Sequence, residues 1–499
     1  MELVFQENQV EYLNRILCDT VIFEQTADVV VPDALPDIDR VVDAFGNVII
    51  RSEECTAGSA SAGGTVQAGV IYVGEDGSVQ TVPAEIPFSA RRDFPKDQED
   101  CTLQCRCSLA SVDARPLNSR KLLVRVSLSC CLTVYAGTRC MFYDLPDPAS
   151  NLQLRRTELP LQMPAGLGEK SFVLNEELEL KPEEPAVERL LKYQCRPRIL
   201  EQNVVGDKAV FKGSLQIHAL YEDREEKLHS RDWSVAFSQY AQLPRELDGG
   251  ALDTCLSMTS AEVEPDSPED CRRLLFSGNV LAQCTVLGEQ KLSFIEDAFC
   301  TDALLKPEFA SCEMTGILDR QTFRENAVAE EAAGVPVDLW VCPGEPETVR
   351  AGGKITVRQP LSCSLLYYDE NGGLQGKILK PSVSAETALS ENGSCRVTEA
   401  DWDEAFCGTG PEGPEVRIPV TLTLECSALQ TISGIKSVKI EDLPEEERKR
   451  PSVILRRTCR EEDLWELAKA CRTPVKNILE ANSLEGDVVP ADTMLLIPL

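Results

Sequence analysis

Residues 454–499, ILRRTCREEDLWELAKACRTPVKNILEANSLEGDVVPADTMLLIPL, contain the clearest succession of secondary-structure signals in the chain. Asp463 stands directly before an apolar run, where its carboxylate can accept a hydrogen bond from an unpaired backbone N–H. Apolar residues then recur at the positions i, i+3, i+4 and i+7: Leu464, Leu467, Ala468 and Cys471. This spacing places one apolar stripe along a helix, so we predict an amphipathic helix that begins after Asp463.

A second helix is signalled by Thr473 and Pro474. Threonine is suited to the cap position, and proline to the first helical position, where its missing N–H costs nothing. Ile478 follows at helical spacing, and Asn482 closes the helix. The apolar residues 495–497 then predict a short returning strand. The order strand, helix, helix, strand can close into one small unit.

This frame resembles a known module. Four separated blocks match the LysM family in order: Asp463-x-Trp465-x-x-Ala468, Thr473-Pro474-Val475, Ile478-Leu479-x-x-Asn482 and Leu496-Ile497-Pro498. The resemblance implies the βααβ fold known for binding N-acetylglucosamine polymers. In the family, two glycine-containing loops line the glycan groove. Here 460–463 and 490–492 lack those glycines and carry acidic residues, which argues against sugar binding.

Composition bounds the remainder of the chain. A length of 499 residues suggests about three to four domains, and 43% hydrophobic residues are ample for folded cores. The net charge of −32 argues against nucleic acid or an anionic membrane surface as a partner. Residues 1–8 have neither a basic start nor a hydrophobic segment, and no apolar run approaches a membrane span, so we expect neither export nor membrane insertion.

The 21 cysteines allow more than one interpretation. Their number is odd, the chain is long and many occupy apolar strand positions, which favours reduced, buried thiols in a cytosolic protein over a disulfide framework. The densest group could suggest structural zinc: Cys101, Cys105, Cys107 and the pair Cys130-Cys131. However, the group lacks paired CxxC knuckles and has no histidine nearby, so we expect no metal.

Internal self-similarity is the second organising feature, because one phrase of sequence occurs three times. The first copy comprises 36–42, 66–72 and 86–89; the second comprises 185–191, 210–221 and 235–238; the third and loosest comprises 355–357 and 365–368. Each copy leads to an alternating strand: 122–130, 274–287 and 416–426. In the last, Val420 and Leu422 face one way while Thr421 and Glu425 face the other, the period of a half-buried antiparallel strand.

We therefore predict a mainly β protein of three antiparallel, sandwich-like repeats followed by a small βααβ module. The expected division is a first β domain at 1–160 with an N-terminal extension, a second at 161–295, a third at 296–440, a linker at 441–451 and the module at 452–499. The linker is charged and bounded by proline, although a helical extension with i,i+4 ion pairs explains the same residues.

The phrase at 31–38, the strand that ends at Tyr221 and the terminal segment 432–435 resemble SPOCS domains. Three such domains and a LysM module form the layout of SipL-like spore coat morphogenetic proteins. The resemblance implies a scaffold in the mother-cell cytoplasm, at the forespore surface, that binds the spore coat morphogenetic ATPase through its LysM module. Its β domains are expected to contact other coat proteins or one another.

Catalytic chemistry finds little support in the sequence. A Ser-His or Cys-His system would need His218 or His229, the two histidines of the chain. Strand alternation places His218 on a solvated face, and His229 lies in a charged run. No P-loop or HExxH motif is present, and 176–181 looks like a solvated strand face rather than a catalytic carboxylate pair. We expect no enzyme activity and no cofactor; a cysteine hydrolase remains the contrasting class.

Partner binding is the remaining class, and Trp465 is its sharpest candidate. It lies beside the buried stripe, so its indole should be partly exposed and suited to anchor an interface, unless it merely covers the small core. Weaker candidates share the same module: Ile454, Arg456, Arg457, Lys469 and Lys476. We predict a non-enzymatic coat-assembly adaptor. The alternative is a LysM protein that binds peptidoglycan or N-acetylglucosamine in the cortex or wall.

Overall fold

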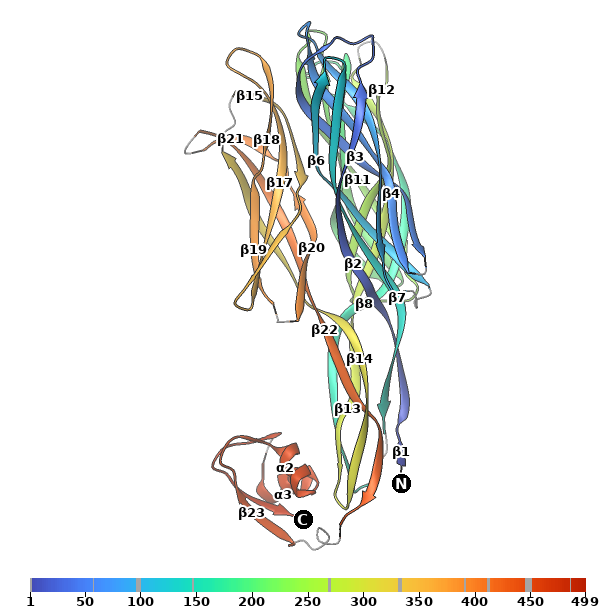
Figure 1. The fold of residues 1–499 in the computed structure, drawn as a ribbon, viewed down its shortest axis with the longest axis vertical. Helices are drawn as coiled ribbons and strands as arrows, with labels where there is room; N and C mark the ends of the chain where they lie inside the picture. Colours follow the sequence, from blue (N-terminus) through green and yellow to red (C-terminus); the bar gives the residue numbers. More distant parts are fainter. Residues whose placement is uncertain are drawn as a thin grey trace.

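The computed structural model describes residues 2–499 except 57, 96–99, 146–147, 268–270, 331–333, 390–391, 411–412, 445–450 and 485. Strands dominate this part of the chain, and its two α-helices lie close to the C-terminus, so the predicted mainly β class is confirmed. Figure 1 shows an elongated body of strands with the helical module beside its lower end. Neither described helix is long and apolar enough to cross a membrane.

The first group of strands builds two three-stranded antiparallel sheets that face each other. One sheet has the order β2-β7-β6, with β2 (Gln6–Val30), β6 (Cys101–Asn118) and β7 (Lys121–Asp144). The other has the order β3-β4-β5, with β3 (Ile38–Thr56), β4 (Ser59–Gly74) and β5 (Val79–Asp93). Alternating side chains such as Val66, Val70 and Leu128 fill the space between the sheets.

The second group repeats this plan. The sheet β9-β10-β11 comprises β9 (Arg189–Val205), β10 (Lys208–Glu222) and β11 (Leu228–Gln242). It faces β8 (Leu152–Glu179), β12 (Ala251–Pro265) and β13 (Arg273–Cys300). The core between them contains Phe172, Phe211 and Phe276.

The third group follows the plan with more interrupted strands. In its inner sheets, β17 (Lys354–Tyr368) pairs with β15 (Val335–Pro343), β16 (Glu347–Ala351), β18 (Leu374–Leu379) and β19 (Ser382–Ala388). The facing sheet contains β14 (Ala303–Glu330), β20 (Gly393–Trp402), β21 (Phe406–Gly410) and β22 (Gly413–Asp442). Along β22, both faces are buried near Glu425, so the predicted half-buried strand is wrong there.

Three long antiparallel strand pairs join the groups: β2 pairs with β7, β8 with β13, and β14 with β22 along nearly their whole lengths. Their lower halves form the narrow stem in Figure 1, where β1 (Glu2–Val4) also pairs with β22. Tyr12, Phe294 and Met314, from three different strand pairs, share one core in this stem. A disulfide between Cys140 and Cys312 joins β7 to β14.

The expected boundaries after 160 and 295 fall inside β8 and β13, each of which continues from the stem into the second group. The expected linker also begins too early, because β22 runs to Asp442. Residues 445–450 of that linker lie outside the described residues.

The three groups share one tight turn after the central strand of the inner sheet. The backbone N–H of Gly74, Asp223 and Asp369 each donates to the carbonyl four residues later. The residue three positions on has a positive φ in each turn: Gly77 at 83°, Glu226 at 60° and Gly372 at 77°. The groups therefore repeat not only in strand order but in the local geometry that sets hairpin register.

The groups meet around buried charges. Lys192 Nζ lies 2.8 Å from Asp43 Oδ2 and 2.8 Å from Asp338 Oδ2. Each of these residues comes from a different group and lies 31 residues before the start of its shared turn. His218 contacts Asp338, and the Ser364 hydroxyl donates to Asp43. Corresponding positions of the three groups therefore meet in one buried cluster of charges.

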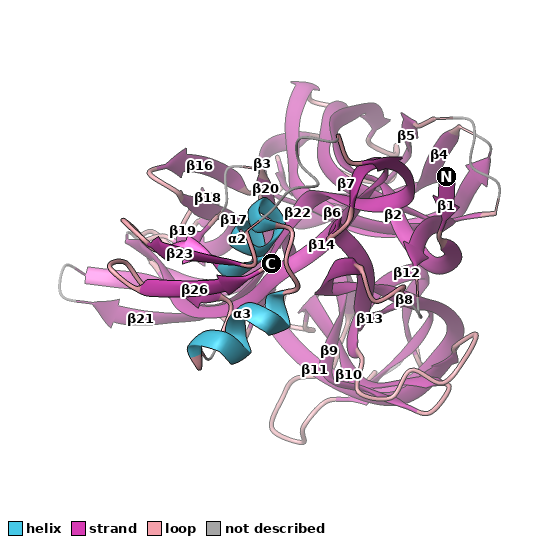
Figure 2. Cartoon of the chain, turned by 90° about the horizontal axis from the view of Figure 1, so that it is seen from below, coloured by secondary structure: helices cyan, strands magenta, loops and turns pink. Residues whose placement is uncertain are grey.

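The C-terminal module contains two short two-stranded sheets and two helices. The elements in chain order are β23 (Val453–Arg457), β24 (Glu462–Asp463), α2 (Leu464–Cys471), α3 (Val475–Asn482), β25 (Val488–Val489) and β26 (Met494–Pro498). The first strand pairs with the last, so the module closes on itself. Figure 2 shows α2 and α3 packed beside β23 and β26.

Candidate partner-binding site

The helix α2 begins as its sequence predicts. Asp463 has extended backbone angles, and its carboxylate accepts a hydrogen bond of 2.8 Å from the Trp465 backbone N–H. Leu464, Leu467 and Ala468 are buried along the predicted stripe. The helix ends at Arg472, whose left-handed conformation directs its N–H to the preceding carbonyls.

The start of α3 differs from the prediction. The helix is capped by Pro474 without a side-chain hydrogen bond, so Thr473 is not its cap. The Thr473 hydroxyl donates instead to the Pro498 carbonyl, at 2.5 Å. Asn482 ends the helix as predicted, and its amide both donates to and accepts from the backbone of Leu496. That exchange fastens α3 to β26.

Trp465 is more deeply buried than its sequence position predicts, with only 9% of its surface exposed. Its indole meets the Phe299 ring edge-on, with 4.9 Å between ring centroids. Phe299 belongs to β13 of the body, not to the module. The expectation of a partly open indole is therefore wrong in this arrangement, because a residue from a distant strand covers it.

Asp297 of β13 is the polar centre of the same contact. One carboxylate oxygen accepts the Trp465 indole N–H at 2.8 Å, and the Lys469 ammonium lies 2.6 Å from that oxygen. Burial acts to raise the pKa of Asp297, but the bonds from Lys469 and Trp465 outweigh it and hold the pKa below its ordinary value. The contact therefore favours a charged Asp297.

A second ion pair flanks this contact. Arg155 of β8 lies 2.9 Å from the Asp463 carboxylate, so the α2 cap is bound from outside the module. Burial acts to raise the pKa of Asp463, but the Trp465 N–H and Arg155 lower it overall. We call the contact among Arg155, Asp297 and Phe299 of the body and Asp463, Trp465 and Lys469 of the module the tail dock.

The other four predicted residues do not gather at the tail dock. Ile454 points toward the core of the module. Arg456 pairs with Glu462 at 2.9 Å, and Arg457 pairs with Asp492 at 2.9 Å. Lys476 lies 3.5 Å from Glu480, one turn along α3. The structure thus brings Trp465 and Lys469 together and disperses the remainder over the module.

An apolar face that was not predicted from the sequence lies on the opposite side of β23 and β26. Leu455 is 71% exposed, and Leu496 lies directly opposite it in the strand pair. Met494 is 63% exposed, and Val453 is exposed at the other end. We call Val453, Leu455, Met494 and Leu496 the outer face. Strand alternation could have found it, because Ile454, Leu495 and Ile497 occupy the inner positions.

The loop that follows β23 and the loop that precedes β26 lie next to each other. The Thr458 hydroxyl donates to the Pro490 carbonyl at 2.7 Å, and the Asp492 backbone N–H donates to the Thr458 carbonyl at 2.8 Å. Asp492, in the second of these loops, adopts a positive φ of 65°. These loops therefore present an exposed carboxylate.

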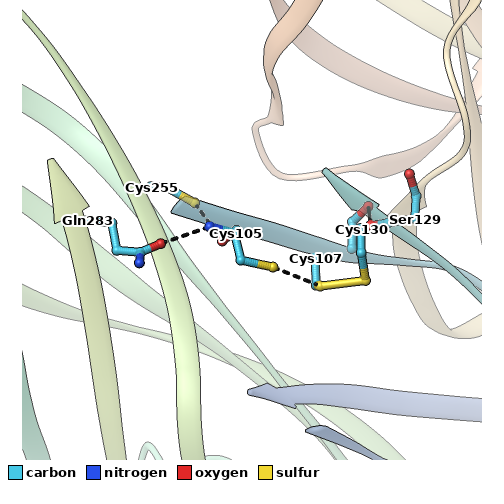
Figure 3. The surroundings of a disulfide bond; sticks show 7 residues. Cys105, Cys107, Ser129, Cys130, Cys255 and Gln283 are labelled. Carbon is cyan, nitrogen blue, oxygen red and sulfur yellow. Dashed lines mark hydrogen bonds between the residues drawn. A yellow bond between two sulfur atoms is a disulfide. The ribbon is translucent and has the colours of Figure 1, made fainter. Parts of the chain in front are cut away.

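The cysteines are not all reduced thiols, contrary to the prediction. Cys107 and Cys130 form a disulfide across β6 and β7, and the Cys105 sulfur lies 3.4 Å from Cys107, as Figure 3 shows. Cys140 and Cys312 form the second. Among the described residues, no group of three or more His, Cys, Asp or Glu side chains is arranged to hold a metal ion.

Each of the two histidines lies against aspartate side chains. His218 is only 3% exposed, so its predicted solvated position is wrong. Its ring lies 2.8 Å from Asp232 and between that residue and Asp338. His229 lies 2.8 Å from Asp223 in the shared turn of the second group. Each imidazole ring is therefore within hydrogen-bond distance of at least one aspartate carboxylate.

Comparison with known proteins adds two matches. Residues 37–117 and 186–267 each match the family model of the SipL, SPOCS domain. The first match spans β3 to β6 and the second β9 to β12, which are corresponding parts of the first and second groups. No curated protein matches the chain at a significant level.

Proposed function

The chain is a SipL-like protein with SPOCS-domain matches at 37–117 and 186–267, and from this we propose that it is a non-enzymatic adaptor in spore coat assembly. The match indicates a sporulation-related protein. Its proposed location is the mother-cell cytoplasm at the forespore surface. No cofactor enters the proposal.

The third group of strands is, in this proposal, a third SPOCS-type repeat. Its turn at Asp369 makes the same backbone bonds as the turns at Gly74 and Asp223. Its Asp338 stands where Asp43 and Lys192 stand in the matched groups. Gln359 departs from the pattern, because the matched groups have Gly64 and Gly213 at that position.

The C-terminal module is proposed to be a LysM-like domain that binds a protein, the spore coat morphogenetic ATPase. The observation that carries this proposal is the outer face. Exposed apolar side chains gathered on one sheet face favour a macromolecular partner, whereas glycan recognition needs polar groups and stacked rings. Arg457 lies at the edge of this face and supplies a cation in a strongly acidic chain.

Trp465 and Lys469 take a different part in the proposed mechanism. Both bind Asp297 in the tail dock, so a partner can reach them only after the module leaves the body. The outer face is exposed while the module stays docked. The ATPase is therefore proposed to bind the outer face first. Other coat proteins, or a second copy, are proposed to bind the β groups.

The test compares capture of the purified ATPase by full-length protein and by a double variant, Leu455→Ser with Leu496→Ser. We expect the double variant to weaken capture at least about tenfold, since two exposed leucines at an interface core together contribute more than about 1.4 kcal/mol. Surface plasmon resonance measures the affinity. Circular dichroism checks that the fold is kept.

The matched control is Leu200→Ser, at an exposed leucine of β9 in the body, which should bind as the wild type does. Removal of residues 445–499 should abolish capture. Equal capture by all variants would reject the outer face. Tight binding of the full-length protein to purified peptidoglycan, with no binding to the ATPase, would replace the proposal by the glycan-binding alternative.

A further inference from the structure

Cys18 on β2 lies near a second thiol, that of Cys131, on the paired strand β7. It lies opposite Thr133 of β7, and Cys131 occupies the diagonal position on the same face. Cys18 is exposed, whereas Cys131 is partly buried. The register shifts between Arg15 and Leu17, immediately before Cys18, so the backbone next to it departs from a regular ladder.

The two sulfurs lie near one shared hydroxyl group, that of Thr133. Thr133 Oγ1 lies 3.7 Å from Cys18 Sγ and 3.9 Å from Cys131 Sγ. Arg396, which comes from β20 of the third group, brings a guanidinium nitrogen to 3.4 Å from Cys18 Sγ. The pair therefore lies where the first and third groups meet.

The surrounding charges favour an anionic sulfur. Arg15 and Arg396 both bind one carboxylate, Glu425, at 2.6 Å and 2.9 Å, and Glu425 is only 2% exposed. Two guanidinium groups against one buried carboxylate leave one positive charge beside Cys18. The Cys131 thiol, with Arg396 and Arg15, lowers the pKa of Cys18 to about 5. Desolvation of the sulfur opposes this shift, although the residue as a whole is exposed.

Most other thiols have the opposite environment. Burial raises the pKa of Cys195 to about 12 and that of Cys363 to about 12, so these groups stay protonated and inert. The neighbouring Cys18 and burial raise the pKa of Cys131, so this thiol keeps its proton. Exposure, cations and a second thiol distinguish Cys18, and this combination marks a reactive cysteine.

We propose that Cys18 and Cys131 form a thiol–disulfide exchange site, in which Cys18 is the nucleophile and Cys131 resolves the intermediate. The substrate class is a disulfide, R–S–S–R′, of a small thiol or of a partner protein. The site is separate from the outer face and the tail dock.

The reaction balances without another reactant. The Cys18 thiolate attacks one substrate sulfur, a Cys18–S–R bond forms, the S–S bond breaks, and R′S⁻ leaves and is protonated by solvent. Cys131 then loses its proton to solvent and attacks the Cys18 sulfur, which releases RS⁻. The cysteine pair loses two electrons and the substrate is reduced to two thiols.

The first test measures labelling of the full-length protein by a pyridyl disulfide at pH 5.5, with each cysteine followed by mass spectrometry. Exposed Cys459 on the module is the internal reference. A thiol of pKa near 5 is mostly ionised there, and after its lower intrinsic nucleophilicity is included it should react roughly twentyfold faster than an ordinary exposed thiol. Labelling of Cys18 no faster than Cys459 would overturn the proposal.

The second test uses oxidised glutathione. The wild type should form the Cys18–Cys131 disulfide and release two glutathione thiols, whereas Cys131→Ser should stop at a glutathione adduct on Cys18 and Cys18→Ser should leave Cys131 unmodified. A stable adduct on Cys18 of the wild type would overturn the resolving role of Cys131. A parallel arm with a disulfide-linked peptide dimer identifies the source: faster reaction with the peptide indicates a protein substrate, and faster reaction with glutathione a small thiol.

Discussion

Lys192 and His218 place two cations in the interior, where an unpaired charge would be strongly unfavourable. Asp43 and Asp338 compensate them, each nearly inaccessible to solvent. Burial opposes the charged imidazole, but the Asp338 charge and the bonds to Asp232 and Asp338 raise the pKa of His218 to about 9. A buried charge network of this kind contributes more to the choice of one arrangement than to stability, because desolvation offsets much of the attraction.

The stability of the protein should therefore decline at alkaline pH. The pKa of His218 is higher in the folded chain, about 9, than its ordinary value of 6.5, so its proton stabilises the fold fully below pH 6.5 and this contribution is lost as the pH rises through about 9. The midpoint of urea unfolding, measured at pH 6, 8 and 10, checks this. His218→Gln should flatten the decline; an equally steep decline in the variant would contradict the assignment.

The shared turn shows how one element is repeated with different residues. Gly77 and Gly372 accommodate the left-handed conformation without steric cost, whereas Glu226 adopts it with a side chain. In the second and third groups the first residue of the turn is an aspartate, Asp223 or Asp369, whose carboxylate accepts the backbone N–H groups two and four residues later. The turn therefore retains its shape despite an unfavourable residue.

Glu226→Gly should stabilise the protein by about 0.5–1 kcal/mol, since it removes the steric cost of the left-handed conformation. The change in the midpoint of urea unfolding measures it. Glu225→Gly is the matched control, one residue earlier in the same turn and outside the positive-φ positions, and it should give no gain. A gain of equal size in both variants would show that the backbone angle is not the cause.

At the scale of the whole molecule, three long antiparallel strand pairs combine in the stem, and the module docks on one of them. Phe299 and Asp297 lie near the end of β13, where the strand emerges from the shared cores and becomes available to α2. Trp465 is thus a core residue shared between module and body. Its replacement by alanine would disturb folding as well as binding, so it is a poor isolated probe of an interface.

Asp297→Ala should release the module. It removes the acceptor of the Trp465 indole and the partner of Lys469, and the latter is then left without its ion pair. We expect faster amide hydrogen exchange in 464–471 and in 297–300 at pH 7, with the β cores unchanged. Asp319→Ala, at an exposed carboxylate of β14, is the control. Unchanged exchange in 464–471 would contradict the tail dock.

Acid should weaken the tail dock. The pKa of Asp297 is lowered in the folded chain, so its contribution is present above the ordinary value of 3.8 and is lost as the pH falls below it. Acid should therefore reproduce in the wild type what Asp297→Ala produces at pH 7.

The sequence alone determined the features that depend on neighbours along the chain. Strand alternation gave the mainly β class, the carboxylate of Asp463 began α2, and Asn482 ended α3, because periodicity and capping bonds act over a few residues. Only the tertiary structure decided the burial of Trp465, the burial of His218 and the Cys140–Cys312 disulfide. Each depends on a partner more than 100 residues away, and packing between distant strands leaves no local pattern from which that partner can be identified.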